Sequence, residues 1–234
     1  LPWNEELQKE VETDRIVTIK NLTADGGGSV IEWCIRNGHT HDKDGNAYFK
    51  PITHFVSHAW KNPFLDLVAA LRSYEYEFAI NSQLDPSAPK LEDMAFYLDV
   101  FCMDQNNLPW QQDPPVDVDE TLKKYIGECG RVLMIAYPSS YPEVFNRVWC
   151  MYEMVTANAL NVPIDYATVP WDLLNTAFST DVPIDVRNAK AQSEADKEML
   201  LDLIEKGVGF DAFNKTMQDN MKHMKRWIAR QNVQ

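Results

Sequence analysis

The chain alternates between short apolar segments and segments with helical spacing from residue 52 to residue 167, and this alternation constrains the fold most. Short runs of apolar residues are typical of strands buried on both faces of a sheet. Strands that alternate with helices pair in parallel through right-handed crossovers. The sequence therefore predicts an α/β fold with strands at 52–57, 95–101, 131–136 and 163–167, and with helices that start at Pro63 and end before a loop at 82–90, and at 120–129 and 144–160.

Composition indicates one large domain with extensions. With 234 residues, of which 45% are apolar, the chain can bury a full core without disulfides or metals. We divide it into an N-terminal extension (1–51), an α/β domain (52–167) and a C-terminal helical extension (168–234) packed on the same domain. Four scattered cysteines without a Cys-x-x-Cys pair predict reduced thiols and a cytoplasmic location.

Charge and hydropathy exclude two classes of partner. The formal net charge of −13 argues against nucleic-acid binding, which needs a basic surface. The longest apolar runs are too short to cross a membrane. We therefore expect no nucleic-acid and no membrane partner, although a helix N-terminus can still bind a small anion.

The extensions carry weaker patterns. In the first, we predict helices at 5–12 and 29–36, an edge strand at 15–22 and a turn at Asp44-Gly45 between short strands. In the second, Ser193 begins a helix that Gly207 and Gly209 end. An apolar, methionine-rich stripe follows at spacings of three and four, and we interpret it as core packing, with a partner groove as the alternative. Its members are Phe210, Phe213, Met217, Met221, Met224 and Ile228.

Polar and aromatic residues follow the first predicted strand. Ser57, His58 and Trp60 lie where that strand ends, and Asn62-Pro63 predicts an N-cap and first turn of the next helix. Unpaired N–H groups at such a helix start favour phosphate, and Lys61 would add a positive charge. In the alternative, these side chains satisfy local hydrogen bonds and Trp60 packs as a lid.

The second predicted strand is followed by Asp99, Asp104 and Gln105. Parallel sheets bind ligands at the carboxyl ends of their strands, so these side chains are candidate binding residues. The alternative is structural: Asp99 would pair with a buried cation, and Asp104 would cap the loop.

The predicted helix at 144–160 carries Trp149 and Glu153 four residues apart, on nearly the same face. A carboxylate beside an apolar stripe is partly desolvated, so its proton affinity rises. Glu153 is therefore the candidate catalytic residue, and the alternative is an ion pair with Arg147.

We predict no metal site. On a strand, His54 and His58 would lie roughly 13 Å apart, and His39 and His41 have no evident third ligand. Residues 40–51 resemble a calcium loop only loosely, because Pro51 replaces the bidentate glutamate. A Cys–His nucleophile at Cys102 or Cys150 is disfavoured by their apolar settings.

Four segments together resemble Toll/interleukin-1 receptor (TIR) domains and the related fungal heterokaryon-incompatibility domains. Trp149-Cys-x-x-Glu153 is similar to the TIR helix motif. Ser57-His-Ala-Trp60 and Leu98-Asp-Val-Phe-Cys-Met-Asp-Gln105 stand where the fungal domains show Ser-Tyr-x-Trp-Gly and Ile-Asp-x-x-Cys-Ile-Asn-Gln, and the fourth segment is the strand at 132–135. The resemblance covers about residues 52–167 and implies a flavodoxin-like parallel sheet flanked by helices.

The resemblance also implies an activity. Many TIR domains hydrolyse or cyclise NAD with the glutamate of this motif, which here is Glu153. It implies that Trp60 or Trp149 stacks on a ring, that the 57–62 loop holds phosphates, and that Asp99, Asp104 and Gln105 support the loops or contact the ribose. NAD or NADP is then a substrate, and no cofactor is needed. Self-association and a role in stress or immune-type signalling are also expected.

One departure and two alternatives accompany this expectation. An acidic, proline-rich loop at 106–119 replaces the segment through which many TIR domains self-associate and gate the site. The first alternative is a non-catalytic self-association or adaptor module. The second is a metal-dependent hydrolase built on His58, Asp99 and Asp104.

Overall fold

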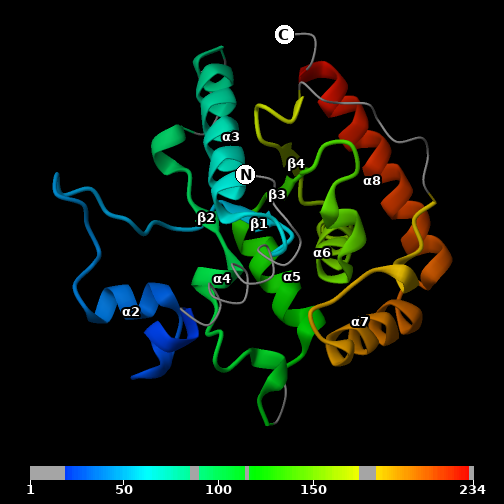
Figure 1. The fold of residues 1–234 in the computed structure, drawn as a ribbon, viewed down its shortest axis with the longest axis horizontal. Helices are drawn as coiled ribbons and strands as arrows, with labels where there is room; N and C mark the ends of the chain where they lie inside the picture. Colours follow the sequence, from blue (N-terminus) through cyan, green and yellow to red (C-terminus); the bar gives the residue numbers. More distant parts are fainter. Residues whose placement is uncertain (1–18, 85–89, 114–115, 174–182, 232–234) are drawn as a thin grey trace, which may run out of the picture.

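The protein is an α/β structure built on a four-stranded, all-parallel sheet. The computed structural model describes residues 19–84, 90–113, 116–173 and 183–231. The strand order is β2–β1–β3–β4 (Figure 1), as in flavodoxin-like sheets. The strands are β1 (His54–Ser57), β2 (Phe96–Tyr97), β3 (Val132–Ile135) and β4 (Ile164–Ala167).

The two central strands, β1 and β3, are buried along their whole length. Phe55 pairs with Tyr97 on one side and with Val132 on the other. Their lack of polar alternation therefore reflects helices on both faces of the sheet, as the sequence predicts.

Strand periodicity divides the core into two layers. Val56, Leu133 and Ile135 pack against α3 (Phe64–Leu84). Phe55 and Val132 face the opposite layer, which contains α5 (Val118–Cys129) and α6 (Val148–Ala159). Because side chains alternate along a strand, Ser57 shares the face of Phe55 and lies toward α6.

The prediction of a strand over 95–101 is wrong beyond its first residues. The strand β2 ends at Tyr97, and α4 (Asp99–Cys102) forms a single helical turn. The Asp99 carboxylate accepts a hydrogen bond from the Val100 backbone N–H at 2.7 Å. This local bond and the favourable placement of an acid in a first turn outweigh the strand propensity of the apolar run.

Two helix boundaries also differ from prediction. The helix α3 begins at Phe64 and extends into the start of the loop predicted at 82–90, ending at Leu84. The side-chain amide of Asn62, the predicted N-cap, instead donates to the Tyr137 carbonyl at 3.2 Å. The helix predicted over 144–160 begins only at Val148. The residues before it form a 3-10 turn, η3 (Glu143–Asn146), and Arg147 between the two has an extended backbone with φ −109° and ψ 119°.

The break at Arg147 joins two distant segments. Lys190 donates its N–H to the Asn146 carbonyl at 2.7 Å, and Val148 donates to the Lys190 carbonyl at 3.1 Å. These bonds form an isolated parallel bridge between Arg147 and Lys190. The start of α6 is therefore tied to the chain that enters α7 (Glu194–Lys206).

The N-terminal extension folds differently from prediction near its start. Residues 19–24 are helical rather than an edge strand, and the predicted helix at 5–12 lies outside the described residues. The predicted helix at 29–36 is confirmed as α2 (Val30–Arg36), which Ser29 begins with a capping box. An antiparallel bridge between His41 and Ala47 confirms the predicted turn. The short 3-10 turns are η1 (Leu91–Asp93), η2 (Pro109–Gln111) and η5 (Val186–Asn188).

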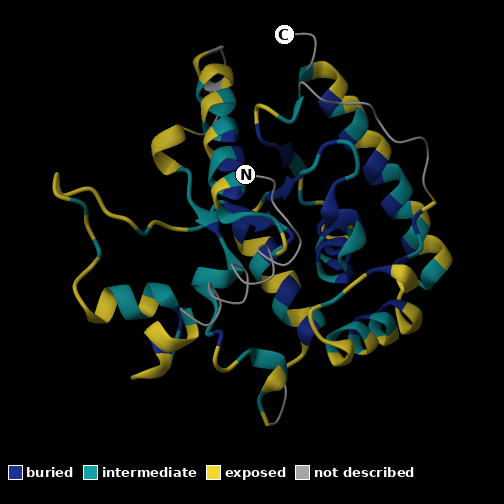
Figure 2. Ribbon diagram, in the orientation of Figure 1, coloured by how far each residue is buried: buried dark blue, intermediate teal, exposed yellow. Residues whose placement is uncertain are grey.

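The C-terminal helices complete the layer that contains α6. The stripe on α8 (Phe210–Gln231) is buried against the sheet layer, which confirms its interpretation as core packing. Figure 2 shows buried residues on the inner side of α8 and exposed residues along its outer side. Within the described residues, no helix combines the length and apolar character that crossing a membrane requires.

Candidate functional site

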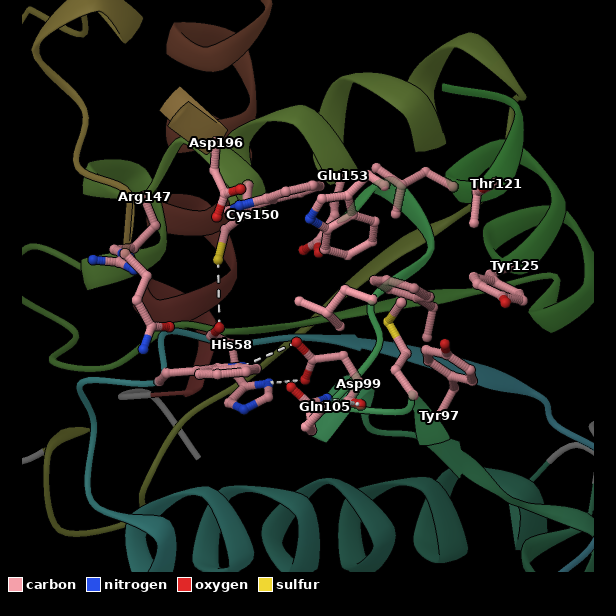
Figure 3. Close-up of a pocket in the computed structure, with 18 of the residues that line it drawn as sticks. His58, Tyr97, Asp99, Gln105, Thr121, Tyr125, Arg147, Cys150, Glu153 and Asp196 are labelled. Atoms are coloured by element: carbon pink, nitrogen blue, oxygen red, sulfur yellow. Dashed lines mark hydrogen bonds and ion pairs between the residues drawn. The ribbon is translucent and has the colours of Figure 1, made fainter. Parts of the chain in front are cut away.

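A cavity of ≈ 280 Å³ opens at the carboxyl ends of β1 and β2, beside α6 (Figure 3). This is the edge at which parallel sheets bind ligands. Its aromatic lining residues are Phe55, Trp60, Tyr97, Trp110, Tyr125 and Trp149. Its other titratable or charged lining residues are Lys20, His58, Asp99, Arg147, Cys150, Glu153 and Asp196.

The carboxylate of Glu153 is the central polar group of the cavity. The Ser57 hydroxyl, at the end of β1, donates to Glu153 Oε2 at 2.5 Å. Burial raises the pKa of Glu153 to about 8, the Ser57 hydrogen bond opposes this rise, and the negative charge of Asp99 adds to it. At neutral pH the protonated form of Glu153 is therefore favoured.

Glu153 forms no ion pair with Arg147 or with any other described residue, although Arg147 lines the same cavity. In Figure 3, Arg147 lies at one end of the cavity and Glu153 nearer its middle. The structural alternative of a Glu153–Arg147 pair is therefore not found, and Glu153 is available to a ligand.

Asp99 organises the wall opposite Glu153. Its carboxylate accepts a hydrogen bond from Trp60 Nε1 at 2.9 Å and lies 3.9 Å from His58 Nδ1. Gln105, which is buried, donates from its side chain to the Asp99 carbonyl at 2.9 Å. Asp99 thus fixes the indole of Trp60 at the cavity, and within the described part of the chain it pairs with no lysine or arginine.

The two candidate thiols, of which only Cys150 lines the cavity, are poor nucleophiles. Cys150 donates from Sγ to the His58 carbonyl at 3.4 Å, and burial raises its pKa well above the usual value. Burial also raises the pKa of Cys102 to about 11. Since the thiolate is the reactive form, the arrangement disfavours a Cys–His mechanism.

The aromatic wall is internally stacked. Trp110 and Trp149 have ring centroids 4.8 Å apart, and Tyr97 stacks between Phe55 at 5.4 Å and Tyr125 at 5.2 Å. The Tyr97 hydroxyl and Trp110 Nε1 are buried without a hydrogen-bond partner among the described residues. Because buried donors are normally paired, a ligand or water that reaches this wall would find two unused polar groups.

The structure separates the predicted site residues into two sets. Six of them line the cavity: His58, Trp60, Asp99, Gln105, Trp149 and Glu153. Ser57 does not line it but donates a hydrogen bond to Glu153, which does. Lys61, Asn62 and Asp104 do not line it. Lys61 pairs with Glu143 at 3.3 Å, and Asp104 accepts hydrogen bonds from the backbone of Gly28 at 3.0 Å and Asn106 at 2.9 Å.

Sequence reasoning missed three contributions to the cavity. Lys20 comes from the helical segment 19–24, Trp110 comes from the acidic loop, and Ser193 and Asp196 come from the start of α7. Trp110 offered a usable signal, since an isolated tryptophan in a polar loop commonly packs over a ligand or core. Lys20 offered none, because its segment alternates only weakly and was predicted as an edge strand.

The residues of the proposed metal hydrolase are not arranged as ligands. Asp104 is held by Gly28 and Asn106, outside the cavity that His58 and Asp99 line. Among the described residues, no group of three or more histidine, cysteine, aspartate and glutamate side chains is placed to bind a metal ion.

Comparison with known proteins adds no relative: no protein-family model, no curated protein and no solved structure matches the chain. Function must therefore be argued from the geometry of the cavity.

Proposed function

We propose that this chain is a TIR-like NAD glycohydrolase or cyclase that cleaves the bond between nicotinamide and ribose in stress or immune-type signalling. The observation that carries the proposal is the placement of Glu153. Its carboxyl group lies in an aromatic-lined cavity at the carboxyl ends of β1 and β2, held by Ser57. The strand order and the position of the glutamate on α6, the helix after β3, are those expected for the TIR resemblance.

The residues of the cavity suit this reaction. The bond from ribose C1′ to the nicotinamide nitrogen breaks, and its electron pair leaves with the neutral base. An oxocarbenium-like sugar develops positive charge, which the Glu153 carboxylate stabilises. Water then bonds to C1′ and releases a proton to give ADP-ribose, whereas attack by an adenine nitrogen gives a cyclic product.

Binding of the substrate would also ionise Glu153. The nicotinamide ring of NAD is cationic, so its approach favours the carboxylate form despite burial. Trp60 and Trp149 line the cavity and offer flat faces for stacking on a cationic ring. The negative charge of Asp99, which helps to raise the pKa of Glu153, would likewise favour a positive charge in the cavity.

Replacement of the glutamate tests the proposal directly. Purified protein is incubated with NAD or NADP over a range of protein concentrations, and nicotinamide is followed by chromatography. We expect Glu153→Gln to lower the rate by about 10²-fold or more, the cost of losing an electrostatic stabiliser of the transition state. Glu128→Gln, an exposed substitution on α5, should leave the rate unchanged.

Circular dichroism and thermal unfolding of both variants establish that the fold is intact. Equal release by the wild type and Glu153→Gln would remove Glu153 from the mechanism. A wild type that releases no nicotinamide at any protein concentration, with or without chelator, would end the proposal itself.

A non-catalytic self-association module is the second candidate, and one observation favours it. The outer side of α3 exposes Leu65 and Tyr76, which are 77% and 70% accessible, together with Ile80. Tyr76 and Ile80 follow Leu65 by 11 and 15 residues, so the three side chains lie on the same side of the helix. Contiguous exposed apolar patches mark protein contacts, and Tyr76 and Ile80, one turn apart, are the adjacent pair on this face.

A further inference from the structure

The cavity contains positive charge that the sequence did not predict. Lys20 and Arg147 are the lysine and arginine side chains among the described residues that line it. Lys61, the residue expected to contact phosphate, is instead paired with Glu143 outside the cavity. Neither Lys20 nor Arg147 forms an ion pair with a described residue.

Lys20 is held in place by the loop that follows α4. The Asn106 side-chain amide donates to the Lys20 carbonyl at 3.1 Å and to the Thr23 hydroxyl at 2.9 Å. Gly28 N–H donates to the Asp104 carboxylate at 3.0 Å. Thr23 is only 1% exposed, so this contact is a packed one. The helical segment 19–24 is therefore anchored to the loop, more than 80 residues away in sequence.

The same loop forms one wall of the cavity. Gln105, Leu108 and Trp110 line the cavity directly after the anchoring Asp104. Lys20 is exposed while lining the cavity, which places its residue at the opening. Segment 19–28 is thus bonded to the loop that forms this wall, and Lys20 of that segment lies at the opening of the cavity.

The cavity is large enough for only part of a dinucleotide, so the rest of the substrate must lie outside it. A volume of ≈ 280 Å³ lies just below the range for small-molecule sites, roughly 300–1,000 Å³. A nicotinamide and its ribose suit such a space, so the diphosphate that follows must lie across the opening. A lysine there would contact an anion without being desolvated in its free state.

We propose that Lys20, with Arg147, binds the diphosphate of the dinucleotide, and that the N-terminal segment is therefore part of the substrate site. This inference rests on the proposed function, because the diphosphate is that of NAD. Figure 3 shows Arg147 at the end of the cavity away from Thr121 and Tyr125, so the phosphates run toward that end.

Equilibrium binding of ADP-ribose tests the inference without requiring turnover. ADP-ribose is titrated into wild type, Lys20→Ala and the matched control Lys61→Ala, and tryptophan fluorescence reports binding through the indoles of the cavity. Loss of one charge-assisted contact, about 1.4 kcal/mol, should raise the Kd about tenfold in Lys20→Ala. It should also reduce the dependence of the Kd on salt, and Lys61→Ala should match the wild type.

Nicotinamide release provides the second arm. With NAD, Lys20→Ala should raise KM with little change in kcat. Nicotinamide riboside has the same scissile bond but no phosphate, so its cleavage should be equal in all three proteins. Equal ADP-ribose affinity in Lys20→Ala and Lys61→Ala, or no ADP-ribose binding by the wild type, overturns the role of Lys20. Absence of nicotinamide release from the wild type overturns the proposed function instead, while the binding titration still decides the role of Lys20.

Discussion

At the scale of single residues, the ionisation of Glu153 controls what the cavity can do. Three influences act on its pKa: burial and the charge of Asp99 raise it, and the Ser57 hydrogen bond lowers it. A buried carboxyl group whose pKa is near the working pH is a common property of functional sites. Its charge can then be set by whatever enters the cavity.

This arrangement predicts a pH profile. Because the carboxylate is the stabilising form, kcat/KM for NAD should rise with pH and level off above the Glu153 pKa of about 8. Removal of the hydrogen bond in Ser57→Ala should move the midpoint to higher pH, whereas Ser73→Ala, on α3, should not move it. A rate that falls between pH 6 and 9 would show that the protonated form is active.

The raised pKa of Glu153 also affects stability: the free energy of unfolding should fall with pH, whereas activity should rise. The folded-state pKa of Glu153 is raised above the unfolded value of 4.5, so the folded protein binds the extra proton between these values. Ionisation of the buried group therefore lowers the free energy of unfolding as pH rises from about 4.5 to about 8. Glu153→Gln should show a higher Tm than the wild type at pH 8.5, and the difference should shrink by pH 5. An identical difference at both pH values would contradict the assignment.

At the scale of elements, sequence patterns located the helices and strands better than the loops between them. Apolar runs correctly indicated β1, β3 and β4, because each is buried by helices. The pattern failed after Tyr97, where Asp99 turns the chain into α4 through a bond to its own neighbour. It also failed at Arg147, where the extended backbone depends on pairing with Lys190, which is distant in sequence.

Two glycines, one within α5 and one directly after it, provide a test of local backbone preference. Gly130 ends the helix with φ +70°, while Gly127 has helical geometry within it, and a Cβ at either position would meet no atom within 4 Å. Gly130→Ala should destabilise the fold by about 1–2 kcal/mol because the left-handed conformation is costly for alanine. Gly127→Ala should stabilise it by up to about 1 kcal/mol. Chemical denaturation measures both, and equal signs would contradict this account.

At the scale of the whole molecule, the candidate site could be predicted only in part. Glu153, Trp60 and Asp99 were identified because each follows a strand or lies on an amphipathic helix of the sheet domain. Lys20 and Asp196 come from outside that domain, and their positions depend on tertiary contacts that no local pattern encodes. The ion pair of Lys61 with Glu143, which keeps Lys61 out of the cavity lining, is likewise a tertiary contact that no local pattern encodes.

The exposed stripe on α3 predicts the assembly behaviour of the molecule. If the stripe mediates self-association, Leu65→Glu and Tyr76→Glu should shift sedimentation equilibrium toward the monomer by adding charge to an apolar contact. Glu75→Gln, on the same helix, serves as the control. A wild type that is already monomeric at high concentration would exclude self-association through this helix.

The bridge between Arg147 and Lys190 gives the molecule a mechanical linkage. Its bonds join main chain to main chain, so side-chain replacement at either residue leaves the linkage in place. A pull on the chain entering α7 would be transmitted to the first turn of α6, and Glu153 is carried on that same helix, little more than one turn further along. Glu153 is thus connected by main-chain bonds to the segment before Ser193 and by its own side chain to Ser57 at the end of β1.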